Sequence, residues 1–157
     1  MDRIKKILAP TDLSELSEAG VRYALELARA IGAEVTVYHV VGTEELMRYD
    51  HLRLLDNVLE KYDAALGRFL EDHCSDLLPL VEVHRKVEMG TPDINIVDEA
   101  KKDGVDLIVI STHGRTGLSH ILVGSVTEKV VRHAPCPVLS IRPERDHKAA
   151  QKAAEAA

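Results

Sequence analysis

The sequence predicts a single α/β domain built on an open, parallel, five-stranded sheet, and three observations lead to it. The spacing of hydrophobic residues switches repeatedly between two and three-to-four along the chain, which is typical of strand–helix–strand units. Residues 107–110 form a continuous apolar run, as expected of an inner strand covered by helices on both faces. The length of 157 residues matches one domain with a core of its own.

Two strands and two helices are predicted in the first half of the chain. Ser14 has a side chain suited to an N-cap, and Gly32 is suited to end the helix that follows. Apolar residues recur every three or four positions from 55 to 70, which makes the second helix the most regular one. The polar stretch 42–50 before it is long enough to act as a lid. The two strands are expected at 4–9 and 34–41.

The second half continues the same alternation. Valines from 81 to 87 alternate with polar residues in a third strand, a pattern that favours the edge of the sheet. Thr91-Pro92 begins a helix that stops at Gly104. Three apolar residues of this helix are expected to face inward, namely Ile94, Val97 and Ala100. A strand at 106–110, a loop at 111–117, a helix from about 125 to 134 and a last strand at 137–141 follow.

The end of the chain differs in composition from the rest. Residues 144–157 are rich in alanine and charge and have no apolar face that a core requires. We therefore expect the domain to span 1–143 and residues 144–157 to form a flexible tail.

Charge and composition exclude several classes of partner. The net charge is −6 and aromatic residues make up only 3% of the chain, so neither a basic patch nor a base-stacking platform for nucleic acid is expected. No apolar run approaches the length of a membrane span. Cys74 and Cys136 lie far apart and are expected to be reduced, partly buried thiols. These features indicate a soluble, cytoplasmic protein that binds neither nucleic acid nor membranes.

No metal site is expected from the spacing of candidate ligands. The cysteines lack the spacing of a zinc site, and the histidines show no ligand spacing with carboxylates or cysteines. Surface or packed positions are expected for these histidines, which include His39, His84, His120 and His133.

A ligand site is predicted where the first and fourth strands end. If these strands are neighbours, Asp12 and the run 111–114 face each other across one crevice, outside the carboxyl ends of the sheet. Gly124-Ser125 precedes a helix whose first-turn amides and dipole favour an anion. Gly114 lets backbone amides approach a phosphate, and the hydroxyls of Ser125 and Thr127 are further donors. On spacing alone, a structural cap at Gly124-Ser125 is as well supported as a phosphate site. For Asp12, the residues alone favour a cap on the first helix or its turn.

Several runs of this sequence together are similar to one known family. The runs STHGRTGL (111–118), ILVGSVTEKV (121–130) and APCPV (134–138) resemble the C-terminal signature of the universal stress proteins, and ILAPTD (7–12) and GTP (90–92) also match. The resemblance spans about residues 2–142. It implies a Rossmann-like sheet of the adenine nucleotide alpha hydrolase-like type, with strand order 3-2-1-4-5, and a homodimer.

The resemblance also implies a set of nucleotide-binding residues. Nucleotide-binding members carry a glycine, two residues, a second glycine, nine residues, and then a glycine followed by Ser or Thr. Gly114 and Gly124-Ser125 match this pattern, whereas the first glycine position is Ser111, which adds a Cβ and a hydroxyl at the ribose contact. By resemblance, Asp12 and the Val40 backbone hold adenine and ribose, while residues of the glycine loop hold the phosphates. The full expected set is Pro10, Thr11, Asp12, Val40, Ile110, Ser111, His113, Gly114, Arg115, Gly124, Ser125, Val126 and Thr127.

The expected function is regulatory binding of ATP, with Mg²⁺ as a companion of the triphosphate. The sequence contains no GxxxxGK[ST] motif and lacks the lysine of an efficient P-loop NTPase, so hydrolysis is expected to be slow at most and no residue is assigned a catalytic role. The alternative is a stress-related dimerisation module that binds no nucleotide and acts through protein partners, and Ser111 is its best support. In both readings the strand at 137–141 is an exposed edge that a second copy would cover.

Overall fold

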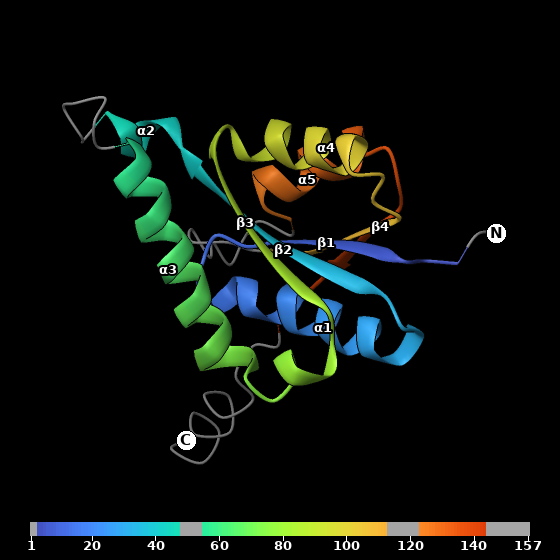
Figure 1. Cartoon of the computed structure of the whole chain (residues 1–157). Coiled ribbons are helices and arrows are strands. Elements are labelled where there is room, and N and C mark those ends of the chain that lie inside the picture. Colours follow the sequence, from blue (N-terminus) through green and yellow to red (C-terminus); the bar gives the residue numbers. More distant parts are fainter. Residues whose placement is uncertain (1–2, 48–54, 113–122, 144–157) are drawn as a thin grey trace, which may run out of the picture.

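Five parallel strands form one sheet in the order β3-β2-β1-β4-β5, which confirms the expected topology (Figure 1). This computed structural model describes residues 3–47, 55–112 and 123–143. The sheet places β1 at its centre and β3 and β5 at its two edges. The bounds of the strands are β1 Lys6–Pro10, β2 Glu34–Gly42, β3 Val83–Gly90, β4 Leu107–Ser111 and β5 Val138–Ile141.

Helices cover both faces of this sheet, as parallel strands joined by crossovers require. In Figure 1, α1 and α3 lie on one face, and α4 and α5 lie side by side on the other. Two short pieces, α2 and the 3₁₀ turn η2, connect longer elements. The bounds of the helices are α1 Glu15–Ile31, α2 Thr43–Leu46, α3 Leu55–Cys74, η2 Leu78–Leu80, α4 Pro92–Lys102 and α5 Ser125–His133.

Two aliphatic cores lie on opposite sides of the sheet. Successive residues of a strand point to opposite faces, so Ile7 packs beneath α1 while Leu8 packs beneath α4 and α5. Cys74, at the end of α3, is fully buried in the first core, and this burial raises the pKa of its thiol to about 11. Cys136 is half-buried beside the second core, and both cysteines are free.

The ends of α1 are formed as the sequence predicts. The Ser14 side chain accepts a hydrogen bond from the Ser17 amide and caps the helix N-terminus. At the other end, Gly32 adopts the left-handed conformation (φ 71°), and its N–H donates to the Ala28 carbonyl at 2.8 Å. The Ser14 cap fixes where α1 begins, and therefore where the turn between β1 and α1 ends.

The prediction for α4 is partly wrong, because the helix turns a different residue inward. Ile94 was expected to be buried and is 56% exposed, whereas Ile96 is 3% exposed. Residues four apart share one side of a helix, so Ile96 and Ala100 stack toward the sheet together with Val97. Ile94 lies about 200° around the helix from Ile96 and falls on the solvent side.

Most strand boundaries differ from the predictions by one or two residues, and further differences concern the third strand, the last helix and the stretch 42–50. The third strand begins at Val83, two residues later than expected, because η2 ends at Leu80 and residues 81–82 connect it to the strand. The last helix ends one residue early, since Ala134 is its C-cap. Part of the stretch expected to be a loop at 42–50 is instead the helix α2, and residues 48–50 lie outside the described residues, as does the expected tail at 144–157.

Candidate functional site

A pocket of about 270 Å³ opens at the carboxyl ends of the central strands. β1 and β4 are neighbours, as expected, and the helix after β1 packs on one face of the sheet while the helix after β4 packs on the other. Crossovers that leave in opposite directions create a crevice between the two strand ends, where open α/β sheets bind their ligands. The pocket occupies this crevice.

The structure brings the expected site residues to this one pocket. Every member of the set that lies within the described residues lines it, namely Pro10, Thr11, Asp12, Val40, Ile110, Ser111, Gly124, Ser125, Val126 and Thr127. His113, Gly114 and Arg115 lie outside the described residues.

Four further lining residues were missed from the sequence, Ser17, Tyr38, Pro92 and Ile96. Tyr38 could have been predicted, because it precedes the expected site residue Val40 by two positions on a strand and therefore points to the same face of the sheet. Pro92 and Ile96 lie four apart on α4, and only the position of that helix in the folded sheet brings them to the pocket.

The turn after β1 is held by hydrogen bonds that start from Thr11. Its amide donates to the Tyr38 carbonyl at 2.9 Å, and its hydroxyl lies 2.7 Å from that of Ser17. The same hydroxyl accepts from the Leu13 amide at 3.0 Å. Leu13 has φ 65°, a left-handed conformation that is unusual for a residue with a branched side chain. Backbone strain of this kind persists where surrounding contacts over-determine it, so this turn is rigidly placed beside the pocket.

Asp12 lines the pocket and also braces the start of α1. Its Oδ1 accepts from the Ser14 amide at 3.0 Å and from the Ser14 hydroxyl. Asp12 therefore braces the turn before α1, whose cap is Ser14 itself, and these bonds orient the carboxylate at the pocket edge. The Asp12 side chain therefore contacts Ser14 and lines the pocket at the same time.

Ser111 uses its side chain to attach α1 to the sheet. Its Oγ accepts from the Gly20 amide at 2.9 Å and donates to the Ser17 carbonyl at 3.3 Å, and the residue is 5% exposed. A Cβ on Gly20 would lie 2.7 Å from the Ser111 nitrogen, so α1 and β4 are in direct backbone contact here. Ser111 stands where the motif has glycine, and its hydroxyl is hydrogen-bonded to α1 on the inner side of the pocket wall.

The opposite wall is the start of α5. Gly124 is its N-cap and provides no side-chain hydrogen bond to the first turn. The Gly124 amide donates to the Thr112 carbonyl at 2.6 Å, which ties this start to the end of β4. The Thr127 hydroxyl donates to the Ser111 carbonyl at 2.8 Å, so its proton is used within the wall, contrary to the expectation that it faces a phosphate. The first-turn amides and the positive end of the helix dipole favour an anion at this wall.

The apolar wall of the pocket carries one phenol, Tyr38, which is buried. Its hydroxyl donates to Glu88 Oε2 at 2.6 Å, and burial together with this hydrogen bond raises the pKa of Tyr38 well above its usual value. Glu88 also pairs with Lys86 at 3.1 Å, and Lys86 in turn pairs with Glu99 of α4 at 2.7 Å. This chain of contacts fixes the tyrosine ring in its uncharged form against α4.

The fold and the pocket together define a class. This is a doubly wound, Rossmann-like α/β protein with a pocket at the switch point of the sheet. The family model of the Universal stress protein family matches residues 3–142, and the chain belongs to this family. Among the described residues, no helix is both long and apolar enough to cross a membrane.

Similar proteins and structures cover most of the chain. Universal stress protein MJ0577 of Methanocaldococcus jannaschii is 33% identical over 153 residues, which span 88% of this chain and 94% of that protein. Universal stress protein MJ0531 of the same organism is 33% identical over 141 residues, covering 88% and 82%. The solved structure of MJ0577 has a TM-score of 0.74 at 31% identity and covers 92% of this chain and all (100%) of that one.

Two further solved structures share the fold. Universal stress protein UspA from Lactobacillus plantarum has a TM-score of 0.75 at 28% identity and covers 90% of this chain and 100% of that one. A universal stress protein in complex with cAMP has a TM-score of 0.61 at 21% identity, covering 91% and 100%. At that identity the likeness is one of fold alone.

Proposed function

We propose that this universal stress protein binds an adenine nucleotide, most readily ATP, in the pocket between the ends of β1 and β4. The observation that carries the proposal is the juxtaposition of two dissimilar walls in one crevice, the Asp12 turn and the start of α5. A carboxylate beside an apolar surface suits a sugar and base, and helix amides suit phosphates. A nucleotide has its base and sugar at one end and its phosphates at the other, which matches the two walls of the crevice.

The residues divide between the two ends of the nucleotide. The Val40 backbone and the apolar surface of Tyr38 and Ile96 would contact the base, and Asp12 would accept from the ribose. The phosphates would lie against the first turn of α5, where the Ser125 and Val126 amides would donate. In this proposal His113, Gly114 and Arg115 complete the phosphate end, and Mg²⁺ accompanies the triphosphate.

Bound ATP would act as a regulatory ligand. The sequence lacks a P-loop lysine and no residue is assigned a catalytic role, so ATP hydrolysis is slow or absent in this proposal. The ligand would order the segments around the crevice and thereby alter a surface that a protein partner recognises. The same proposal assigns the protein to the cytoplasm.

A nucleotide assay on purified protein tests the proposal. We expect adenine nucleotide to be released when the purified protein is denatured, and calorimetric titration of nucleotide-free protein with ATP to give one site per chain. A protein that retains no adenine nucleotide and gives no heat with ATP would instead support the dimerisation module that acts through protein partners.

We also propose that the protein is a homodimer formed through β5. This strand lies at the edge of the sheet, and its residues Val138, Leu139 and Ile141 are only partly buried. An edge strand leaves backbone hydrogen-bonding groups exposed, and pairing with a second copy of the same strand would cover them. Light scattering should give the mass of two chains, and the mass of one chain across the accessible concentration range would rule the dimer out.

A further inference from the structure

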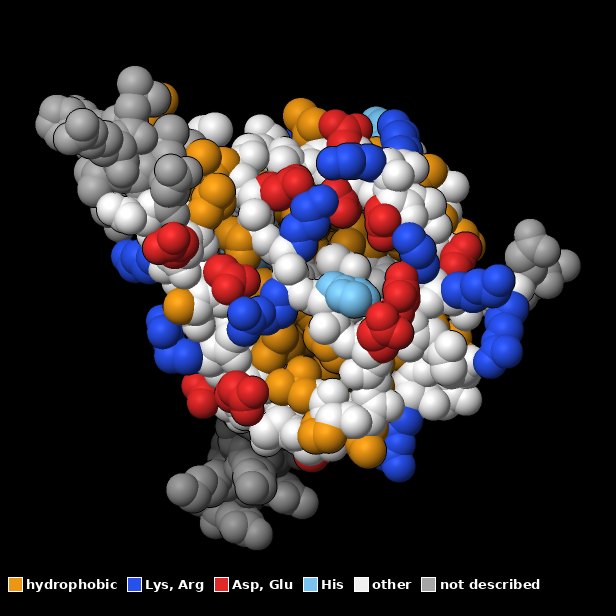
Figure 2. All heavy atoms as spheres, viewed as in Figure 1, with side chains coloured by type: hydrophobic (Ala, Val, Ile, Leu, Met, Phe, Trp, Pro, Cys, Tyr) orange, Lys and Arg blue, Asp and Glu red, His pale blue; other side chains and the backbone are white. Residues whose placement is uncertain are grey.

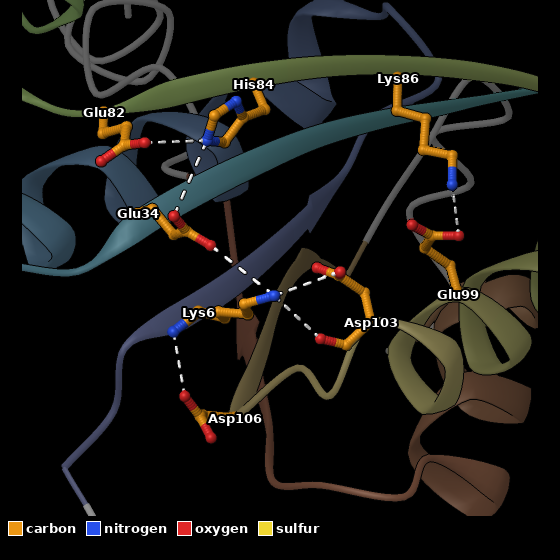
Figure 3. Close-up of polar contacts among 8 residues, drawn as sticks. All are labelled: Lys6, Glu34, Glu82, His84, Lys86, Glu99, Asp103 and Asp106. Carbon is orange, nitrogen blue, oxygen red and sulfur yellow. Dashed lines mark hydrogen bonds and ion pairs between the residues drawn. The ribbon is translucent and has the colours of Figure 1, made fainter.

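A second cluster of polar groups lies at the opposite end of the sheet from the pocket. Glu34 begins β2, Glu82 directly precedes β3, and His84 is the second residue of β3. The close-up in Figure 3 shows the three side chains pointing toward one another from these neighbouring strands. One ligand atom from each, a histidine nitrogen and two carboxylate oxygens, lies within 4.8 Å of the others.

The register of the sheet brings these side chains together. Thr36 pairs with His84 and Val35 with Val83, so Glu34 stands level with Glu82. Side chains two apart on a strand share a face, which places Glu82, His84 and Glu34 on the same side of the sheet. The cluster is thus held by two rigid, hydrogen-bonded strands. The sequence-based expectation that His84 has no carboxylate at ligand spacing is therefore wrong, because Glu82 is two residues away and Glu34 is across the strand pair.

The two distances from the His84 nitrogen are close to those between neighbouring ligands of a metal ion. His84 Nε2 lies 3.3 Å from Glu82 Oε1 and 3.7 Å from Glu34 Oε2. In a tetrahedral site with bonds of about 2.0–2.2 Å, neighbouring ligand atoms are about 3.3–3.6 Å apart. A cation placed among the three atoms would therefore require little movement of the side chains.

The charge around the cluster is unbalanced in favour of a cation. Lys6 Nζ lies 3.9 Å from Glu34 Oε1, but it is closer to Asp103 Oδ1, at 3.2 Å. This lysine therefore pairs with two carboxylates, those of Glu34 and Asp103. Counted together with Glu82, the group carries an excess of two negative charges when His84 is neutral. Figure 2 shows acidic side chains around a histidine on this face of the molecule. One divalent cation would neutralise the excess.

We propose that Glu34, Glu82 and His84 form a binding site for a divalent transition metal of the zinc class. Imidazole nitrogen with carboxylate oxygen is a donor set that Zn²⁺ accepts, whereas Mg²⁺ and Ca²⁺ prefer oxygen alone. The side chains are 31%, 69% and 52% exposed, respectively, so a metal reaches them from solvent. Three protein ligands leave the fourth position of a tetrahedral site to water or to a donor from another molecule.

Titration of tag-free, chelator-treated protein with Zn²⁺ tests the site. We expect wild-type protein to bind one Zn²⁺ per chain at this site and His84→Ala to weaken that binding by at least tenfold, because even second-shell changes at metal sites cost about 10–100-fold. Glu34→Gln, which preserves the size of the side chain and removes its charge, should weaken binding in the same direction. His133→Ala is the matched control, since His133 is an exposed histidine on α5 remote from the cluster.

A second probe reports on the ligands directly. Co²⁺ bound by His84 should give a visible absorption spectrum that His84→Ala abolishes and His133→Ala retains, with circular dichroism confirming that both variants are folded. Failure of wild-type protein to bind Zn²⁺, or equal Zn²⁺ affinity of His84→Ala and wild type, would overturn the proposal. ATP binding is expected to be unchanged in His84→Ala, because the nucleotide pocket lies at the other end of the strands.

Discussion

Replacing Ser125 with glutamate should lower the affinity for ATP by at least 100-fold while leaving the protein folded. Ser125 is the first residue of α5 and lines the pocket where we propose that the phosphates lie. A carboxylate about 4 Å from a phosphate charge is repelled by about 4 kcal/mol near a protein surface, and 1.4 kcal/mol is a factor of ten in affinity. The same charge in the first turn of a helix stabilises it by about 0.3–1 kcal/mol. Binding and stability should therefore move in opposite directions.

The control for this change is Ser125→Gln, which adds nearly the same volume without the charge. We expect it to weaken ATP binding by less than tenfold. Calorimetric titration gives the two affinities, and thermal unfolding gives the two stabilities. If Ser125→Glu bound ATP as tightly as Ser125→Gln, the phosphates would not lie against α5, and the proposed orientation of the nucleotide would be wrong.

Replacing Gly20 with alanine should destabilise the fold by about 1–3 kcal/mol, the usual range for overpacking a core. The added Cβ would lie 2.7 Å from the Ser111 nitrogen and 3.1 Å from the Ile110 carbonyl carbon. These are backbone atoms of an inner strand, so no change of rotamer relieves the contact, and α1 must move away from β4. The opposing term is the higher helix propensity of alanine, about 1 kcal/mol, and we expect the clash to outweigh it.

Gly42→Ala is the matched control, because a Cβ at Gly42 meets no atom within 4 Å. We expect its free energy of unfolding to stay within about 0.5 kcal/mol of wild type. Urea denaturation of the three proteins compares them directly. A Gly20→Ala protein as stable as wild type, or more stable, would show that helix propensity dominates and that α1 does not press on β4 as tightly as described.

Much of the fold was predictable because local signals and the global arrangement agree. Ser14 and Gly32 cap α1 where the sequence places its ends, and the apolar run of β4 lies inside the sheet. Ile94 is a case in which the local sequence is not sufficient. A helix with several apolar residues does not by itself indicate which of them will be buried against the sheet. That choice depends on the rotation of α4, which is set by tertiary contacts of Ile96 and Ala100.

The candidate site divides in the same way. Residues that follow β1 and β4 were found from the sequence, because parallel strands end at one edge of the sheet. Ile96 and Ser17 were not, since they reach the pocket only through the packing of whole helices. Glu34 beside His84 was missed for a related reason, because residues 50 positions apart become neighbours only through the register of β2 and β3.

The burial of Cys74 affects how readily its sulfur would react with oxidants. Burial raises the pKa of its thiol to about 11, so the thiol is protonated at pH 7, whereas the thiolate is the form that peroxides attack. Burial raises the pKa of Cys136 as well, and the chain has no third cysteine. Neither thiol is therefore expected to react readily with peroxide.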